Sequence, residues 1–226
     1  MPETPAGRAD DLQPAEEQRR DTYRRLAFLY DNVLERLIAP LRAIALRVYP
    51  PSPGLRVLDL GCGTGAHLER YLEAGCVVAG VDTSEAMLAR ARLRLGDRAD
   101  LRHGDAAHLP FPDASFDLVT ATLMLHELTE ETRDAVVREV LRVLAPDGRL
   151  LVTDFHTGPL RPPKGWLWRA FAVGAEVLAW HLNRSWAFLR AGGVPAMAAR
   201  HGLDVERVKV VSAGNIGLYL LRRPSA

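Results

Sequence analysis

The sequence predicts an α/β fold in which helices cover both faces of a mainly parallel sheet. From Leu55 onward, short apolar strands alternate with helices, and strands that alternate with helices pair in parallel. Further along, two strand-like segments are separated by little more than residues 212–214, which permits only an antiparallel pair. We therefore expect a doubly wound sheet with one reversed strand at or near its end.

Each element is predicted from its apolar spacing and its boundary residues. The run from Leu118 to Leu125 is almost continuously apolar, which is typical of a central strand buried on both faces. Helices are predicted at 66–74, 84–95 and 129–144. Strands are predicted at 56–60, 76–82, 99–105, 116–122, 149–155, 203–211 and 215–223.

The segment before the first strand differs in composition and in the spacing of its apolar residues. Residues 1–22 are polar and rich in Pro and charge, which predicts a disordered lead-in without the apolar run of a secretory signal. Apolar residues then recur at helical spacing up to Val48, and Pro40 predicts a division into two helices. We expect residues 23–226 to form one domain, with N-terminal helices over 23–53.

Composition argues against several classes of protein. The chain has 226 residues, 48% of them apolar, so it can bury a sizeable core. Its formal net charge of +1 provides no basic field for a nucleic acid. Cys62 and Cys76 cannot form a disulfide framework, and no segment reaches the ~20 apolar residues of a membrane span. We expect a cytoplasmic protein with no nucleic-acid partner and no membrane span, and its oligomeric state is not predicted.

Residues 157–200 fit the alternating pattern least well. All four tryptophans lie in this segment, at Trp166, Trp168, Trp180 and Trp186. One interpretation is a helical cover packed on the core. The other is a lid over a pocket for an apolar substrate, or a surface for a membrane or a partner protein. The sequence leaves these interpretations open.

The stretch VLDLGCGTGAH, Val57 to His67, places Gly61, Gly63 and Gly65 at alternate positions directly after the first strand. Glycine permits tight turning and close approach of a ligand to the backbone. The following helix offers free N–H groups and the positive end of its dipole. Open parallel sheets bind ligands at the carboxyl ends of their strands, so the loop predicts a binding site for an anionic or carboxylate-bearing group.

Asp82 ends the second predicted strand and can accept hydrogen bonds from the two hydroxyls of a ribose. The alternative is helix capping, because the residues from Asp82 to Glu85 also resemble an N-terminal cap. When Asp82 is considered together with the glycine loop, binding of a ribose is the better interpretation of this residue. A nicotinamide dinucleotide and S-adenosylmethionine both carry a ribose, and the glycine spacing alone does not decide between them.

Three further features favour S-adenosylmethionine. Asp59 lies two residues before the first glycine, where it suits an ammonium group but not a pyrophosphate. Asp105 closes the third strand, where it can accept a hydrogen bond from an adenine amine. The reversed strand near the end is a feature that ordinary dinucleotide domains lack.

The segments VLDLGCGTG, GVDTSEAML, HGDAAHLPFPDASFDLVTATLMLHEL and REVLRVLAPDGRLLVTDF resemble class I S-adenosylmethionine-dependent methyltransferases. The most similar branch is the type-11 group, which includes the C-methyltransferases of ubiquinone and menaquinone synthesis. The motifs run from Val57 to Phe155, about half the chain, and FLYDNVLERL resembles the entry segment of that branch more weakly. The resemblance implies a Rossmann-like sheet of seven strands with an antiparallel last strand, and S-adenosylmethionine as the cofactor.

The resemblance also implies which residues contact that cofactor. Gly61 and Gly63 approach its methionine part, and Asp59 lies near the ammonium. Asp82 binds the ribose, while Met87 packs on the adenine. Cys62 is expected mainly as a small packing residue. The full implied set is Tyr30, Asp59, Gly61, Cys62, Gly63, Thr64, Gly65, Asp82, Thr83, Met87, Asp105, Ala106 and Thr122.

The region after the fourth strand faces the methyl group in this family. Residues 122–125 read TLML, where amino-group methylases often carry an Asn-Pro-Pro-aromatic tetrapeptide, so carbon or oxygen methylation is favoured. His126 is a candidate base for a phenol or an acidic carbon, and a structural histidine that hydrogen-bonds locally is the alternative. His156, Trp166 and Trp168 are candidate contacts for a small apolar or aromatic acceptor. No metal-ligand spacing is visible.

Two other functions are alternatives to a methyltransferase. One is a non-catalytic protein on the same fold that binds S-adenosylmethionine or a partner through the Trp-rich segment. The other is a nicotinamide-dependent oxidoreductase, which the position of Asp59 argues against.

Overall fold

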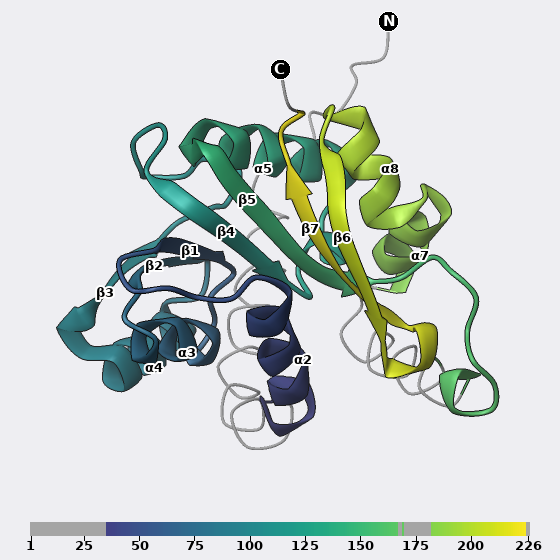
Figure 1. Cartoon of the computed structure of the whole chain (residues 1–226), viewed down its shortest axis with the longest axis horizontal. Helices are drawn as coiled ribbons and strands as arrows, with labels where there is room; N and C mark the ends of the chain where they lie inside the picture. The colour runs from purple at the N-terminus through teal and green to yellow at the C-terminus, as the bar shows by residue number, and fades with distance from the viewer. Residues whose placement is uncertain (1–34, 167–168, 170–181, 225–226) are drawn as a thin grey trace, which may run out of the picture.

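The computed structural model describes residues 35–166, 169 and 182–224. Its seven described strands form one sheet in the order β3-β2-β1-β4-β5-β7-β6 (Figure 1). The strands are β1 Arg56–Leu60, β2 Val77–Asp82, β3 Ala99–His103, β4 Phe116–Thr122, β5 Leu144–Phe155, β6 Asp204–Val211 and β7 Ile216–Arg222. The helices are α2 Glu35–Val48, α3 Ala66–Glu73, α4 Glu85–Leu95, α5 Glu130–Val143, α7 Leu182–Arg190 and α8 Gly193–Arg200, with 3-10 turns η3 Gly96–Arg98, η4 Leu125–Glu127 and η5 Ser212–Gly214.

The strand directions confirm the predicted fold class. Strands β1 to β5 pair in parallel along β3-β2-β1-β4-β5. Strand β7 runs antiparallel to both of its neighbours, β5 and β6. The reversed strand therefore lies second from the edge, between two strands that precede it in the sequence.

The core lies on both faces of the sheet because side chains alternate along each strand. Val57, Leu118 and Leu151 pack with residues of α2, α3 and α4 on one face. Their neighbours Leu58 and Val119 pack with residues of α5, α7 and α8 on the other. Figure 1 shows these two helical layers on opposite sides of the sheet. Burial on both faces explains the continuous apolarity of β4, since each fully buried leucine contributes about 1.5–3 kcal/mol.

The prediction that Pro40 divides two helices is wrong, because Pro40 lies inside the single helix α2. The proline ring is exposed, whereas Ile38, Leu41 and Ala45 are buried on the opposite side of the helix. The backbone hydrogen bond that proline cannot donate is therefore lost on the exposed side of the helix, where solvation makes the loss less costly. Packing of the buried face holds the helix together across the proline.

Strand β5 also begins earlier than predicted, at Leu144 rather than Arg149. Leu144 pairs with Phe116, and the register shifts between Phe116 and Leu118. Residues 145–148, which lie between the predicted helix and strand and read Ala-Pro-Asp-Gly, are therefore an irregular start to the strand. The register shift accommodates the proline and glycine between the Phe116–Leu144 and Leu118–Arg149 pairs.

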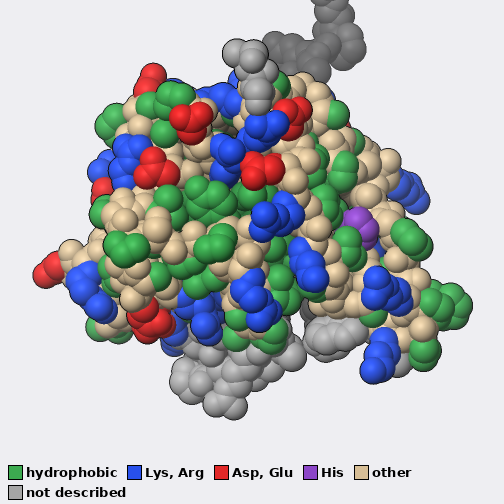
Figure 2. All heavy atoms as spheres, in the orientation of Figure 1, with side chains coloured by type: hydrophobic (Ala, Val, Ile, Leu, Met, Phe, Trp, Pro, Cys, Tyr) green, Lys and Arg blue, Asp and Glu red, His purple; other side chains and the backbone are tan. Residues whose placement is uncertain are grey.

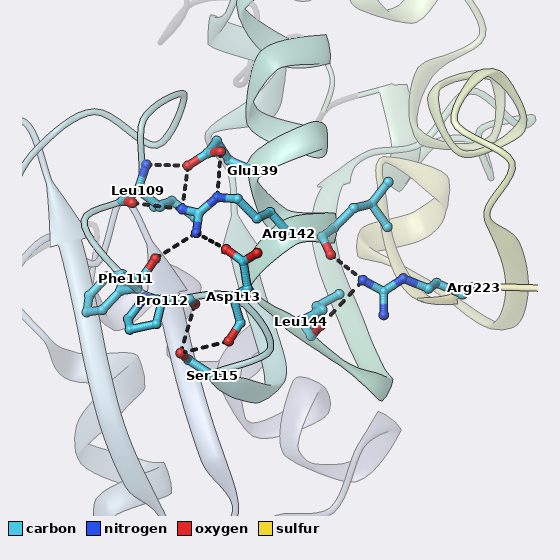
Figure 3. Close-up of polar contacts among 10 residues, drawn as sticks. Leu109, Phe111, Pro112, Asp113, Ser115, Glu139, Arg142, Leu144 and Arg223 are labelled. Carbon is cyan, nitrogen blue, oxygen red and sulfur yellow. Dashed lines mark hydrogen bonds and ion pairs between the residues drawn. The ribbon is translucent and has the colours of Figure 1, made fainter.

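The long loop between β3 and β4 is anchored to α5 by Arg142 (Figure 3). The Arg142 guanidinium donates to the backbone oxygens of Leu109 and Phe111 at 2.9 and 2.8 Å, and to Asp113 Oδ1 at 2.7 Å. Glu139 accepts from the Leu109 N–H at 2.8 Å, and the adjacent Arg142 lowers the pKa of the Glu139 carboxyl. These contacts fix the far end of the loop that begins with Gly104 and Asp105.

The segment predicted as a helical cover is described over residues 157–166, 169 and 182–200. Helix α8 packs on β5 and β6, and α7 packs on η4. Trp168 and Trp180 lie outside the described residues. No helix among the described ranges is long and apolar enough to cross a membrane. Figure 2 shows acidic and basic side chains interspersed over the upper part of one face, and mainly basic and apolar ones at its lower right.

Candidate cofactor site

The candidate site lies where the strand order changes direction. Strand β1 lies between β2 and β4, so the connections that leave β1 and β4 pass to opposite faces of the sheet. The loop after β1 meets the residues after β4 at this point, because a Cβ added to Gly61 would lie 3.7 Å from the Met124 side chain. A crevice at such a switch point is the usual ligand site of an open α/β sheet.

The three loop glycines all have positive φ, at 61° for Gly61, 53° for Gly63 and 75° for Gly65. A side chain at Gly65 would also clash, because its Cβ would lie 2.9 Å from Leu95 Cδ1. A Cβ on Gly63 would meet nothing within 4 Å. Gly65 is therefore needed for packing against α4, whereas Gly63 leaves its backbone open to a ligand.

Asp82 ties the glycine loop to β2 and α4. Its Oδ2 accepts from Gly63 N at 2.8 Å and its Oδ1 accepts from Ser84 N at 2.8 Å. Burial raises the pKa of the Asp82 carboxyl, and these two backbone hydrogen bonds oppose that rise. Ser84, not Asp82, caps α4 by accepting from Met87 N at 3.4 Å. Each Asp82 oxygen retains capacity for a second hydrogen bond, such as one from a hydroxyl.

Asp59 lies beneath the loop with only 3% of its surface exposed. The β1–β4 register places it opposite Thr120, whose Oγ1 donates to Asp59 Oδ1 at 2.5 Å. His67 Nδ1 lies 3.7 Å from the same oxygen. The carboxylate is thus held at the switch point, where a ligand cation would stabilise its charge.

Cys62 and Thr64 direct their side chains into the protein. Arg94 donates to Thr64 Oγ1 at 2.8 Å and to its backbone oxygen at 3.0 Å. Cys62 Sγ packs so closely on Gly80 that a Cβ there would lie 2.8 Å away, and burial raises the pKa of the thiol. These contacts fit a structural role for both side chains in ordering the loop, as expected for Cys62.

The remaining predicted contacts lie after β2 and β3 and at the end of β4. Gly104 N donates to Asp82 O at 3.1 Å, which places Asp105 beside the end of β2. Asp105 is exposed, and its Oδ1 accepts from Ala107 N at 2.9 Å. The other predicted contacts are Thr83, exposed after β2; Met87 and Ala106, both buried; and Thr122, half-buried at the end of β4. Tyr30 lies outside the described residues.

His126, the predicted candidate base, is buried in η4. Its Nδ1 lies 2.7 Å from Asp154 Oδ1. Asp154 is fully buried and also accepts from the backbone N–H groups of Leu125, His126 and Phe155 at 3.1, 3.2 and 2.7 Å. The pair therefore joins the turn after β4 to the end of β5. Such local hydrogen bonding is what the alternative interpretation of His126, a structural histidine, predicts.

His156 follows β5, and its Nδ1 lies 2.6 Å from the Tyr219 hydroxyl. Burial lowers the pKa of His156, and the nearby positive charge of Arg169 lowers it further. Trp166 is 65% exposed, and Trp168 lies outside the described residues. The structure therefore brings His156 close to the end of the sheet and leaves Trp166 on the surface.

Sequence reasoning missed Thr120 and Asp154, the partners of Asp59 and His126. Thr120 had a usable signal, because it is a polar residue in an otherwise apolar central strand. Such a residue is buried and needs a hydrogen-bond partner. Asp154 had a weaker signal of the same kind at the end of β5.

Comparison with known proteins assigns the family. Residues 58–152 match the model of a methyltransferase domain. Demethylmenaquinone methyltransferase of Clavibacter sepedonicus is 40% identical over 121 residues, which cover 53% of this chain and 49% of that protein. An uncharacterized methyltransferase of Synechocystis sp. is 36% identical over 184 residues, covering 81% of this chain and 80% of that protein. The match therefore spans about half of the first relative and most of the second.

A solved structure has the same fold over nearly the whole chain. The 1,6-didemethyltoxoflavin-N1-methyltransferase of Burkholderia thailandensis, with its substrate and S-adenosylhomocysteine bound, superposes with a TM-score of 0.65. The two chains are 19% identical, and the match covers 99% of this chain and 94% of the other. With this fold, the glycine loop and the two sequence relatives, the chain belongs to the family of S-adenosylmethionine-dependent methyltransferases.

Proposed function

We propose that this chain binds S-adenosylmethionine at the loop after β1 and transfers its methyl group to carbon or oxygen of a small, apolar or aromatic acceptor. The observation that carries the proposal is the Asp82 carboxylate, which joins the glycine loop, β2 and α4 beside the buried Asp59. Two carboxylates and the open space beside Gly63 fit a ligand with hydroxyls, cationic centres and one carboxylate of its own.

Each part of the cofactor has a matching group in this arrangement. We assign the methionine carboxylate to the backbone around Gly61 and Gly63, and the ammonium to Asp59. We assign the ribose hydroxyls to Asp82, which retains hydrogen-bonding capacity. Asp105 and Ala106 are assigned to the adenine edge, with Thr83, Met87 and Thr122 around it.

The protein's contribution to the reaction is chiefly positioning. S-adenosylmethionine supplies a methyl group on a sulfonium, which is already activated for transfer. Holding the acceptor in line and excluding water can lower a barrier by about 7–11 kcal/mol. The turn after β4 is suited to this task because Asp154 fixes His126 and the backbone around it. We therefore assign His126 to positioning this turn.

The acceptor proposal rests on separate observations. A relative is named for demethylmenaquinone, a quinone, which supports a ring-containing apolar acceptor here. Trp166 is exposed next to Lys164 and close to Arg161, both also exposed. Exposed tryptophan beside basic side chains suits the interface of an anionic membrane, where an apolar acceptor would dissolve. Surface association with a membrane is thus part of the proposal.

Calorimetric titration tests cofactor choice, using S-adenosylmethionine and NADH as ligands. We expect micromolar binding of S-adenosylmethionine, and micromolar binding of NADH alone would contradict the proposal. Asp82→Ala should weaken S-adenosylmethionine binding at least tenfold, about 1.4 kcal/mol, because the acceptor for Gly63 N and Ser84 N is lost together with the proposed ribose contact. Asp100→Ala is the control, since Asp100 is exposed on the neighbouring strand β3.

Turnover is tested with quinones, phenols and membrane extracts as acceptors and a labelled methyl donor. Methyl transfer to a ring carbon or hydroxyl is the expected result. If the cofactor binds and no acceptor in the panel is methylated, the non-catalytic alternative is favoured instead.

A further inference from the structure

A buried polar cluster beneath the glycine loop is not used by the proposed function. His67 is only 3% exposed, and neither of its ring nitrogens has a hydrogen bond. The Tyr71 hydroxyl is also buried without a partner. These three are the only such side-chain atoms in the described part of the chain. An unpartnered buried polar group costs about 1–3 kcal/mol, so finding all three on two neighbouring side chains requires an explanation.

The geometry links this cluster to Asp59. His67 is the second residue of α3, directly after the loop, and its ring lies 5.2 Å from the Tyr71 ring at 56°. His67 Nδ1 is 3.7 Å from Asp59 Oδ1, which is within ion-pair distance but too long for a hydrogen bond. Asp59 Oδ1 is meanwhile the acceptor for Thr120. A small movement of either side chain would complete a charged hydrogen bond.

The surrounding charges leave Asp59 as the nearest partner of His67. Asp82 at the end of β2 interacts electrostatically with Asp59. Arg42 lies on the buried side of α2, and Arg94 of α4 is engaged with Thr64 and with Glu69 of α3. Of these groups, only Asp59 is within ion-pair distance of the imidazole.

We infer that His67 is the exchangeable counter-ion of Asp59: the imidazole holds a proton while the site lacks a cation, and releases it to solvent when the methyl donor binds. This inference rests on the proposed function. The methyl donor carries an ammonium and a sulfonium, whereas the demethylated product keeps only the ammonium. The donor should therefore displace the His67 proton more completely than the product does. His67 would act as a positioning residue that distinguishes donor from product through the charge on Asp59.

The proposed exchange conserves protons and charge. Binding converts an imidazolium–carboxylate pair and a cationic ligand into a carboxylate–ligand pair, a neutral imidazole and one proton in solvent. Acid therefore opposes donor binding, and the apparent affinity should fall by up to about tenfold per pH unit once the free site holds the proton.

Calorimetry with the full chain tests the inference between pH 5.5 and 7.0, below the range in which amino groups like that of the ligands titrate. Titrations in phosphate and in imidazole buffer, which differ in ionisation enthalpy, give the number of protons released. We expect S-adenosylmethionine to release more protons than S-adenosylhomocysteine from the unaltered protein. In His67→Asn, both the release and the pH dependence of affinity should be lost.

His201→Asn is the matched control, because His201 Nε2 pairs with Asp134 at 2.9 Å between α8 and α5, outside the cofactor site. It should retain the proton release of the unaltered protein. Equal release by His67→Asn and the unaltered protein would overturn the inference, as would equal release by the two ligands.

A spectroscopic measurement keeps the inference testable if His67→Asn does not fold. The ring resonances of His67 in the unaltered protein, followed over the same pH series, should report a protonated imidazole without ligand and a neutral one with S-adenosylmethionine. Unchanged resonances would refute the inference while the cofactor still binds. If neither S-adenosylmethionine nor S-adenosylhomocysteine binds, the proposed function fails, and the inference fails with it.

Discussion

Two buried histidine–aspartate pairs lie at the same edge of the sheet and differ in how completely they are bonded. In the pair after β4, His126 Nδ1 is 2.7 Å from Asp154, which also accepts three backbone N–H groups. In the pair beneath the glycine loop, His67 Nδ1 is 3.7 Å from Asp59, and both its nitrogens lack hydrogen bonds. The first pair is built to hold a turn, and the second retains freedom to respond to a ligand.

The difference follows from the faces on which the pairs lie. Asp59 shares the face of Val57 with α2, α3 and α4, whereas Asp154 shares the face of Val152 with α5 and α7. On the second face, the turn η4 presents backbone N–H groups directly to the carboxylate. On the first face, Thr120 is the donor to Asp59. The same two residue types therefore serve different purposes according to the donors around the acid.

The largest expected effect is a loss of stability from breaking the fully hydrogen-bonded His126–Asp154 pair. Asp154→Ala should destabilise the protein by about 3–5 kcal/mol, because it leaves a buried histidine and three backbone donors without their acceptor. Urea denaturation measures this loss. Asp147→Ala provides the comparison, since Asp147 is exposed at the start of β5 and should cost little. A loss below about 1 kcal/mol for Asp154→Ala would mean that the pair does not hold the turn.

A second test separates the packing role of the glycine loop from its binding role. Gly65→Ala should cost about 1–3 kcal/mol through its clash with Leu95, in addition to the cost of a left-handed backbone. Gly63→Ala carries only the backbone cost, about 1 kcal/mol, because its Cβ meets open space. Gly63→Ala should instead reduce cofactor affinity more strongly than stability. Equal stability losses in the two variants would contradict this division.

The smallest expected effect is on the buried cluster of His67 and Tyr71, whose polar atoms lack hydrogen bonds. Here the change in the free energy of unfolding should have the opposite sign. Tyr71→Phe should leave stability unchanged or raise it by about 1 kcal/mol, because the hydroxyl it removes has no partner. Tyr219→Phe is the matched comparison and should lose about 1 kcal/mol, since that hydroxyl contacts His156 at 2.6 Å. Thermal unfolding of both variants would show the contrast. A clear loss in Tyr71→Phe would reveal a hydrogen bond to that hydroxyl.

The elements around the glycine loop were predictable because they follow one another in the sequence and have local sequence signatures. The β1 strand, the glycine turn and the start of α3 follow one another in sequence, and Asp82 meets the loop because parallel strands end at the same edge. The reversed strand was predictable from the shortness of its link to β6. In each of these cases, chain geometry alone restricts the outcome.

The rest depended on contacts between distant segments. The polar pairs Asp59–Thr120 and His126–Asp154 join residues 61 and 28 positions apart, so they depend on strand register, which no local pattern reveals. Pro40 stays helical because tertiary packing overrides its local preference. Whether Trp166 faced a pocket or solvent depended on the path of a segment with no strong periodicity.

The position of β7 governs the order in which the sheet can be completed. This strand is the last of the seven along the chain, yet it lies between β5 and β6. During synthesis, β6 has no partner and β5 keeps an open edge until residues 216–222 have left the ribosome. Deleting β7 alone would therefore detach β6 as well, and nascent chains stalled between the two strands would be the species most prone to aggregate.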